Sequence, residues 1–182
     1  MIRSNLLLEK SKEIPFWQLL YNVVINEISK IAKIYNFNEI ETPIFESTNL
    51  FSKPLGSQSD VVLKEMYTFL DKNNDSITLR PEYTTPMIRA AISNNLLNNL
   101  PCKVFGFGPM FRRERPQKGR YRQFNQINFE NFGSNDSFAD VELILIAKKF
   151  IETVLPNNNC ILHINSLGDK ETLKIYKKEL SN

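Results

Sequence analysis

The stretch from Lys103 to Phe132 constrains the fold most, because it reads as two extended segments joined by a strongly basic loop. Both segments, Lys103–Glu114 and Gln123–Phe132, are rich in aromatic and apolar residues, as strands are. Pro116 and Gly119 predict the loop between them. Around this loop, one carboxylate, Glu114, opposes six cations: Arg112, Arg113, Arg115, Lys118, Arg120 and Arg122. Charge runs are usually solvated faces, but this run is flanked by strands and therefore marks a candidate site.

The second segment alternates, which assigns its side chains to faces because successive residues of a strand point to opposite sides. One face carries Arg122, Phe124, Gln126, Asn128 and Glu130; the other carries Gln123, Asn125, Ile127 and Phe129, of which the last two can enter a core. A polar face interrupted by a phenyl ring fits either a binding surface or a solvated sheet face. Both interpretations stay open from this strand alone.

Three side chains of this region suit an adenine nucleotide. The guanidinium of Arg112 can pair with phosphate oxygens, the carboxylate of Glu114 can accept a hydrogen bond from an exocyclic amine, and Phe124 can stack on a base. Neither GxxxxGK[ST] nor GxGxxG occurs in the sequence. A nucleotide would therefore be held by side chains.

The rest of the chain predicts an α+β domain around an antiparallel sheet, because long helices stand beside consecutive strands joined by turns. Apolar residues at spacings of three and four predict the long helices. The expected helices are Ile14–Tyr35, Thr48–Lys53 (ended by Pro54 and Gly56), Thr84–Asn94, Ser137–Val154 and Lys170–Leu180. The expected extended segments are Glu39–Phe45, a hairpin of Glu65–Leu70 with Ser76–Leu79, and Cys160–Asn165.

A second candidate site follows the hairpin, in the run TLRPEYTTP. Thr84 as N-cap and Pro86 in the first turn are explained by the start of a helix. That account leaves Glu82 unexplained, and a carboxylate there could hold a cationic α-amino group.

Composition excludes several classes of protein. The 182 residues, 42% hydrophobic with a net charge of +3, are typical of a globular chain. No apolar run reaches the length of a membrane span, and the two cysteines, Cys102 and Cys160, form no CxxC and are expected to be reduced thiols. We therefore expect a cytoplasmic protein with no membrane partner. His163 is read as structural within its strand, and no metal site of the protein's own is expected.

Four stretches resemble histidyl-tRNA synthetase, a class II aminoacyl-tRNA synthetase, over essentially the whole length of the chain. EIETPIFESTNLF resembles the motif 1 region, VVLKEMYTFLDKNNDSITLRPE the hairpin before the substrate site, FRRERPQKGRYRQFNQ motif 2, and HINSLGDKE the strand and turn that close this part of the catalytic domain. The PQKGRYRQF run is far more specific than the general class II pattern. The resemblance implies one N-terminal portion of a catalytic domain over residues 1–182, with motif 1 at about 14–45 and motif 2 at about 103–133.

By resemblance, the fold is a class II antiparallel sheet of six or seven strands flanked by helices and incomplete at its C-terminal end. Motif 3 and the anticodon-binding domain would lie beyond Asn182. The implied activity is that of an ATP-dependent histidine–tRNA ligase, which forms histidyl-adenylate from histidine and ATP with Mg²⁺ and transfers the acyl group to tRNA(His). The implied assembly is a homodimer built through motif 1, and a separate C-terminal chain is a further possible partner.

The resemblance also implies residue roles. For ATP these are Arg112 on the α-phosphate, where it is catalytic, Glu114 on the adenine amine, Arg120 near the phosphates and Phe124 stacked on adenine. For histidine, the α-amino group is held by Glu82, Thr84 and Gln126, and the imidazole faces Glu130. The tRNA acceptor end is contacted by Arg115 and Gln117.

The sequence also departs from the family pattern. Tyr83 stands where the family commonly has Gly, so it is expected to crowd the amino-acid pocket or to impose a different turn; Arg113 and Asn125 occupy positions often held by His. We expect the 182-residue chain alone to have little or no aminoacylation activity. Two alternatives stay open: a non-catalytic paralogue like the regulatory subunit of ATP phosphoribosyltransferase, and a module for tRNA binding or dimerisation.

Overall fold

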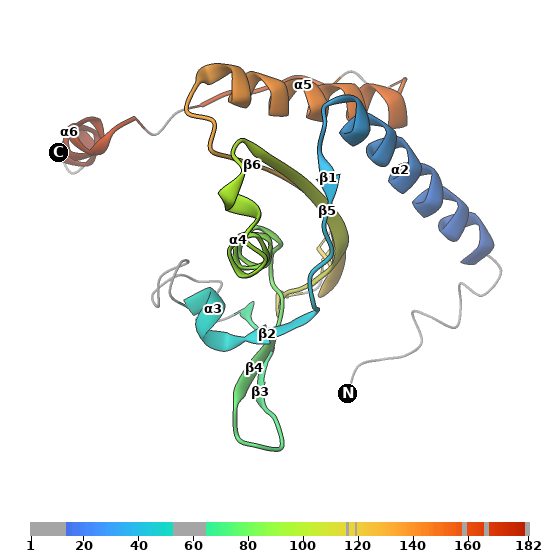
Figure 1. Cartoon of the computed structure of the whole chain (residues 1–182), viewed down its shortest axis with the longest axis vertical. Coiled ribbons are helices and arrows are strands. Elements are labelled where there is room, and N and C mark those ends of the chain that lie inside the picture. Colours follow the sequence, from blue (N-terminus) through green and yellow to red (C-terminus); the bar gives the residue numbers. More distant parts are fainter. Residues whose placement is uncertain are drawn as a thin grey trace.

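A computed structural model of the chain describes residues 14–52, 65–115, 117–118, 120–157, 160–165 and 168–180 (Figure 1). Its centre is a long curved hairpin of β5 (Cys102–Phe111) and β6 (Gln123–Phe132), paired antiparallel. The short strand β1 (Asn38–Glu39) runs parallel to β5 and completes a three-stranded sheet in the order β1-β5-β6. The predicted bounds of β6 are confirmed, and β5 is shorter than predicted at its loop end.

A second three-stranded sheet has the order β2-β4-β3 and is antiparallel throughout. It consists of β2 (Phe45–Ser47), β4 (Ser76–Leu79) and β3 (Thr68–Leu70). The α+β class and the predicted hairpin are confirmed, although the first strand of the hairpin is shorter than expected. Within the described residues, two small sheets stand where a single sheet of six or seven strands was expected.

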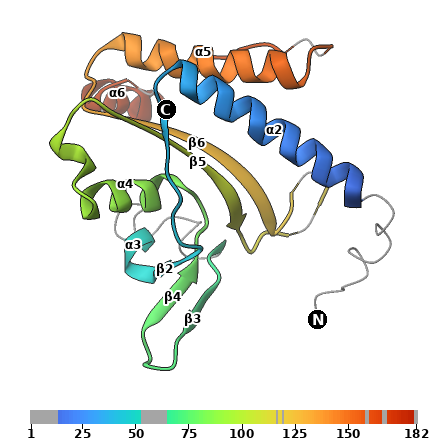
Figure 2. The same ribbon diagram turned by 45° about the vertical axis from the view of Figure 1, so that its right-hand side comes forward.

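Two long helices cover one side of the curved hairpin, as Figures 1 and 2 show: α2 (Ile14–Ile34) and α5 (Ser137–Val154). Their buried contacts with the sheet form a core of Ile31, Ala32, Phe37, Phe105 and Ile146. Phe129 of β6 packs against this core and stacks on Phe105 with ring centroids 5.5 Å apart. The face assignment that put Phe129 toward a core is therefore confirmed.

The concave side of the hairpin holds α4 (Thr84–Ser93), which Figure 1 shows inside the curve. Here the buried core consists of Tyr83, Met87, Val104 and Met110, with Phe124 packed against it. The short helix α3 (Thr48–Ser52) contacts α4 from an earlier part of the chain, and the short helix η2 (Leu96–Asn98) follows α4 in sequence. The opposite face assignment, with Phe124 away from Phe129, is confirmed as well.

The predicted strand Cys160–Asn165 is wrong, because these residues pair with no strand among those described and are exposed. An apolar run becomes a strand only where a neighbouring strand takes up its backbone hydrogen bonds. His163 is accordingly an exposed residue and not part of a strand. Pro54, Gly56, Pro116 and Gly119, which were expected to end a helix or form a loop, lie outside the described residues.

The last helix, α6 (Lys170–Leu180), begins after Asp169, whose carboxylate accepts a hydrogen bond from the backbone N–H of Thr172 at 2.8 Å. Hydrogen bonds from Thr172 lower the pKa of this exposed carboxyl below its usual range. Among the described helices, none is both long enough and apolar enough to cross a membrane.

Candidate functional site

Arg112 follows directly after β5 and is held at three points. Its backbone N–H donates to the carbonyl of Arg122 at 2.9 Å, and its Nε donates to the carbonyl of Pro81 at 2.9 Å. The Cζ atom lies 5.2 Å from the centroid of the Phe124 ring, within the range of a cation–π contact. These side-chain contacts use only Nε and the face of the guanidinium. Among the described residues, no carboxylate forms an ion pair with Arg112, so its two terminal nitrogens can bind an anionic group of a ligand.

The neighbouring polar side chains of β6 form a connected row on the concave face. Gln126 Nε2 donates to Asn128 Oδ1 at 3.3 Å, and Asn128 Nδ2 donates to Glu130 Oε1 at 2.7 Å and to Thr84 Oγ1 at 3.1 Å. The Oε1 atom of Gln126 is buried and has no hydrogen-bond partner among the described residues. A buried acceptor without a donor is costly and rare, so this atom indicates where a ligand donor would fit.

The start of α4 differs from the expected cap. Thr84 is the first residue of the helix, and Tyr83 is the N-cap residue without a side-chain hydrogen bond. Glu82 takes the capping role instead, since its two carboxylate oxygens lie 3.0 and 3.3 Å from the backbone N of Thr85. The Thr84 hydroxyl is thereby free to join the polar row through Asn128.

Two glycines of β5 lie opposite this row, Gly108 across from Gln126 and Gly106 across from Asn128. A Cβ added at Gly106 would lie 2.2 Å from Cε1 of Tyr83, so the Tyr83 ring occupies the space that a side chain of residue 106 would need. Tyr83 is fully buried, and its hydroxyl donates to the carbonyl of Ile40 at 3.4 Å. This ring is therefore packed against the sheet, so the structure accommodates the large side chain of Tyr83 by placing it in the space left by Gly106.

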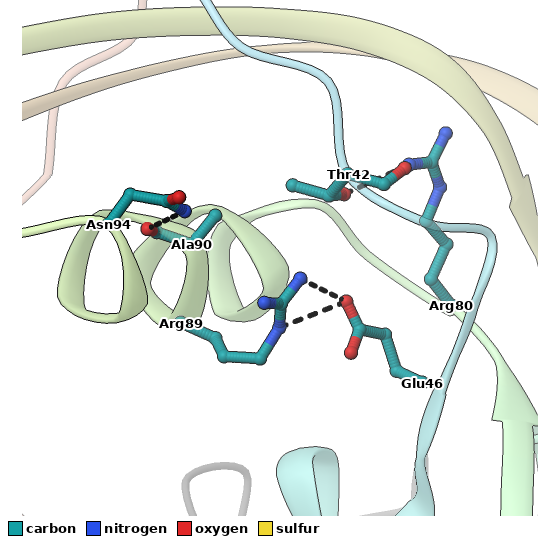
Figure 3. Close-up of polar contacts among 6 residues, drawn as sticks. All are labelled: Thr42, Glu46, Arg80, Arg89, Ala90 and Asn94. Atoms are coloured by element: carbon teal, nitrogen blue, oxygen red, sulfur yellow. Dashed lines mark hydrogen bonds and ion pairs between the residues drawn. The ribbon is translucent and has the colours of Figure 1, made fainter.

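Arg80 stabilises the same region through contacts with Thr42, Tyr83 and Pro109. It is only 2% exposed, and its Nε donates to the carbonyl of Pro109 at 3.0 Å. Its Nη1 donates to the carbonyl and the hydroxyl of Thr42 at 2.7 and 3.0 Å (Figure 3). Its Cζ lies 4.4 Å from the centroid of the Tyr83 ring. Figure 3 also shows the ion pair of Arg89 with the buried Glu46, at 2.8 Å, which joins α4 to β2.

The basic loop is more open. Glu114 forms an ion pair with Arg120 at 3.5 Å, in which the arginine is largely exposed. Arg115 and Gln117 are exposed. The loop base is fixed by the backbone, because the N–H of Arg113 donates to the carbonyl of Glu65 at 2.7 Å.

The structure thus brings together most of the side chains predicted from the sequence. Arg112 and Phe124 are in contact, Thr84 and Glu130 both bind Asn128, and Gln126 joins the same row. Glu114 and Arg120 form a separate pair, and Arg115 and Gln117 stand on the loop. Two further residues join the site without having been predicted: Asn128, which the alternation had placed on the polar face without a role, and Arg80, for which the sequence offered no signal beyond its place between a strand and Pro81.

A cavity of about 840 Å³ lies elsewhere, between the end of α2, the α4–η2 connection and the start of β5. None of the predicted site residues lines it. Two of its lining asparagines, Asn36 and Asn95, have a local explanation, since both adopt a positive φ, which asparagine tolerates well. The described residues hold no group of three or more His, Cys, Asp or Glu arranged to bind a metal ion.

Comparisons with known proteins identify the family of the chain. Residues 67–181 match the family model of the tRNA synthetase class II core domain (G, H, P, S and T). Histidine–tRNA ligase of Wolbachia pipientis subsp. Culex pipiens (strain wPip) is 52% identical over 152 residues, which are 84% of this chain and 37% of the relative. That of Rhodospirillum rubrum is 50% identical over 150 residues, which are 82% of this chain and 36% of the relative.

Solved structures give the same result. Apo S. aureus histidyl-tRNA synthetase superposes with a TM-score of 0.61 at 36% identity, covering 73% of this chain and 30% of the other. An ATP phosphoribosyltransferase regulatory subunit/histidyl-tRNA synthetase from Bacillus halodurans superposes with a TM-score of 0.66 at 21% identity, covering 77% and 35%, and shows the fold alone. The chain spans 36–37% of the length of the two curated relatives described above. The family predicted from the sequence is confirmed: the chain belongs to the class II tRNA synthetase core-domain family and, within it, is similar to histidine–tRNA ligases.

Proposed function

We propose that this chain carries the part of a histidine–tRNA ligase that activates histidine with ATP, forming histidyl-adenylate before transfer to tRNA(His). The observation that carries the proposal is the row on one face of β6. Along this face of β6, the Phe124 ring, which contacts Arg112, comes first. It is followed by Gln126, whose buried Oε1 accepts no hydrogen bond from the described residues, and then by the carboxylate of Glu130. This order offers a nucleotide subsite beside an amino-acid subsite.

In the nucleotide subsite, adenine stacks on Phe124 and Glu114 accepts a hydrogen bond from its exocyclic amine. Arg112 is the catalytic cation. As the histidine carboxylate attacks the α-phosphorus, negative charge grows on the phosphate oxygens and on the leaving pyrophosphate, and a guanidinium fixed by Pro81 stabilises this charge without having to reorganise. Arg120 assists near the phosphates, and Mg²⁺ arrives bound to ATP.

In the amino-acid subsite, Gln126 Oε1 accepts a hydrogen bond from the α-ammonium group, with Glu82 and Thr84 close to the same end. Glu82 retains acceptor capacity, because an ionised carboxylate accepts several hydrogen bonds and only one donor, the Thr85 N–H, is described for it. Glu130 accepts the N–H of the imidazole and thereby selects one tautomer. No nucleophilic side chain is needed, since the substrate supplies its own carboxylate.

Exposed residues of the basic loop and of α2 suggest the macromolecular partners. Arg115 and Gln117 are exposed on the basic loop and contact the acceptor end of tRNA(His). The motif 1 helix α2 carries the exposed apolar side chains Leu19, Leu20 and Val23, which supports a homodimer through motif 1. A separate C-terminal chain is a further proposed partner, and we place the protein in the cytoplasm.

The test is histidine-dependent exchange of pyrophosphate into ATP, measured for the 182-residue chain alone and together with the C-terminal part of a histidine–tRNA ligase. We expect exchange in the mixture, its abolition by Arg112→Ala, and no change with Lys149→Ala on the exposed face of α5. Calorimetry should show that Glu130→Gln weakens histidine binding more than ATP binding. Equal losses of both ligands, or near-normal exchange in Arg112→Ala, would contradict the assigned roles.

Binding separates the alternatives. A chain that binds histidine but not ATP is a regulatory paralogue. A chain that binds an RNA acceptor stem but neither small molecule is a tRNA-binding module. The contact of Arg112 with Phe124 favours the ligase over the regulatory paralogue, because binding histidine alone has no need of a phosphate-binding cation beside a ring that can stack on a base.

A further inference from the structure

We propose that Asn128 is a positioning residue that sets the amino-acid subsite, by holding Gln126 and Glu130 in the orientation that receives a substrate with both an ammonium group and a ring N–H. This proposal rests on the proposed function. It assigns a role to Asn128, which the proposed function leaves without one.

The first step is the hydrogen bonding of Asn128. Its Nδ2 donates to Glu130 Oε1 at 2.7 Å and to Thr84 Oγ1 at 3.1 Å, while its Oδ1 accepts from Gln126 Nε2 at 3.3 Å. Three of the side chains expected to hold histidine therefore meet at one amide. A primary amide supplies both a donor group and an acceptor, which is what a carboxylate on one side and a carboxamide on the other require.

The second step concerns Gln126. Because its Nε2 is engaged by Asn128, its Oε1 is left as the free end of the carboxamide, and this atom is buried without a donor among the described residues. Without Asn128, the carboxamide can rotate and present its donor end, which repels an ammonium group. Asn128 thus fixes the polarity of the subsite and not only its shape.

The third step concerns the support of Asn128 itself. Its cross-strand neighbour is Gly106, whose missing side chain is replaced by the buried ring of Tyr83. Asn128 Nδ2 also lies 3.7 Å from the sulfur of the buried Met87 on α4. Strand, ring and helix therefore surround one half-buried amide, so its position does not depend on the substrate.

The test compares substitutions at Asn128 with the same substitutions at Asn125, which lies on the same strand, is exposed, and points to the other face. Asn128→Ala removes the amide that hydrogen-bonds Gln126, Thr84 and Glu130. Asn128→Asp keeps the shape of the side chain but places a second carboxylate next to Glu130. Asn128→Ser retains a hydroxyl that can donate. L-Histidine and ATP are titrated separately into each 182-residue variant by calorimetry, and thermal unfolding is recorded.

We expect Asn128→Ala to weaken histidine binding about tenfold and Asn128→Asp to weaken it more, with Asn128→Ser in between and ATP binding changed less than twofold. Asn125→Ala and Asn125→Asp leave both ligands unaffected. Asn128→Ser serves as the decisive variant if Asn128→Ala does not fold.

Equal histidine binding by the Asn128 and Asn125 variants overturns the positioning role and leaves the proposed function standing. Parallel losses of histidine and ATP also overturn it, because a purely structural residue would produce them. Absence of histidine binding in the unsubstituted chain contradicts the proposed function itself, and the positioning role with it.

Discussion

Arg80 is a buried cation whose described partners are carbonyl groups, a hydroxyl and a ring. Burying a charge is costly unless it is well hydrogen-bonded, and here Thr42 and Pro109 supply three acceptor atoms while Tyr83 supplies the ring. The backbone carbonyl of Arg80 also accepts from the N–H of Phe111. Arg80 therefore fixes the end of β5, which Arg112 follows directly, and the turn at Pro81, whose carbonyl accepts a hydrogen bond from Arg112.

Arg80→Ala should lower the free energy of unfolding by about 3 kcal/mol, because two backbone carbonyls and the Thr42 hydroxyl lose a charged donor at once. Urea denaturation of the variant measures this loss. The matched control is Arg113→Ala, which removes an exposed guanidinium and should change stability by about 0.5 kcal/mol or less. Similar midpoints for the two variants would show that Arg80 does not anchor the site.

The sequence predicted which residues belong to the site better than it predicted the hydrogen bonds between them. Alternation along β6 placed Phe124 and Glu130 on one face correctly, because the period of a strand is fixed. It could not show that Arg80 would reach Thr42, 38 positions earlier, or that Asn128 would join Thr84, 44 positions earlier. Such contacts depend on how distant elements pack, and no local pattern encodes them.

Among the elements, α4 shows how a helix start and a binding subsite share residues. Its first backbone N–H groups need acceptors, and Glu82 provides one for Thr85 in place of the expected Thr84. A carboxylate at this end also interacts favourably with the helix dipole. Glu82 is therefore committed partly to the fold, and its proposed contact with the substrate ammonium comes in addition.

Glu82→Ala should cost about 1 kcal/mol of stability through loss of this cap. Glu82→Gln retains an acceptor oxygen and should cost less, while still weakening histidine binding because the negative charge is gone. Thermal unfolding together with histidine titration separates the two effects. If Glu82→Gln were as destabilised as Glu82→Ala, the cap would depend on charge and not on the accepting oxygen.

Elements with strong internal patterns were predicted closely, as Ser137–Val154 and Gln123–Phe132 show. Cys160–Asn165 was predicted as a strand and is not one, because its apolar composition says nothing about the presence of a pairing partner. The single sheet expected by resemblance appears as two small sheets in the described residues for the same reason: pairing is a property of neighbours.

At the scale of the whole molecule, the curved hairpin separates a face buried under α2 and α5 from a face that carries the site (Figure 2). The basic loop joins the two strands at the Phe111–Gln123 end of the hairpin, next to the proposed nucleotide subsite. Exposed cations beside a nucleotide site would draw in the acceptor end of an RNA by attraction to its phosphates.

Arg115→Ala should therefore weaken binding of a tRNA acceptor stem and reduce the slope of log affinity against log salt by about 1, the loss of one phosphate contact. Fluorescence anisotropy over a series of salt concentrations measures this slope. Lys149→Ala, which removes an exposed charge on α5 instead, should leave the slope unchanged. An equal reduction by both variants would assign the effect to net charge and not to the loop.

The most direct measurement is a crystal structure of the 182-residue chain with L-histidine and a non-hydrolysable ATP analogue. The account predicts adenine stacked on Phe124, the α-phosphate on Arg112, and the histidine ammonium within hydrogen-bond distance of Gln126 Oε1. Density for the nucleotide in another place, such as the cavity beside Asn95, with the β6 face left empty, would contradict it.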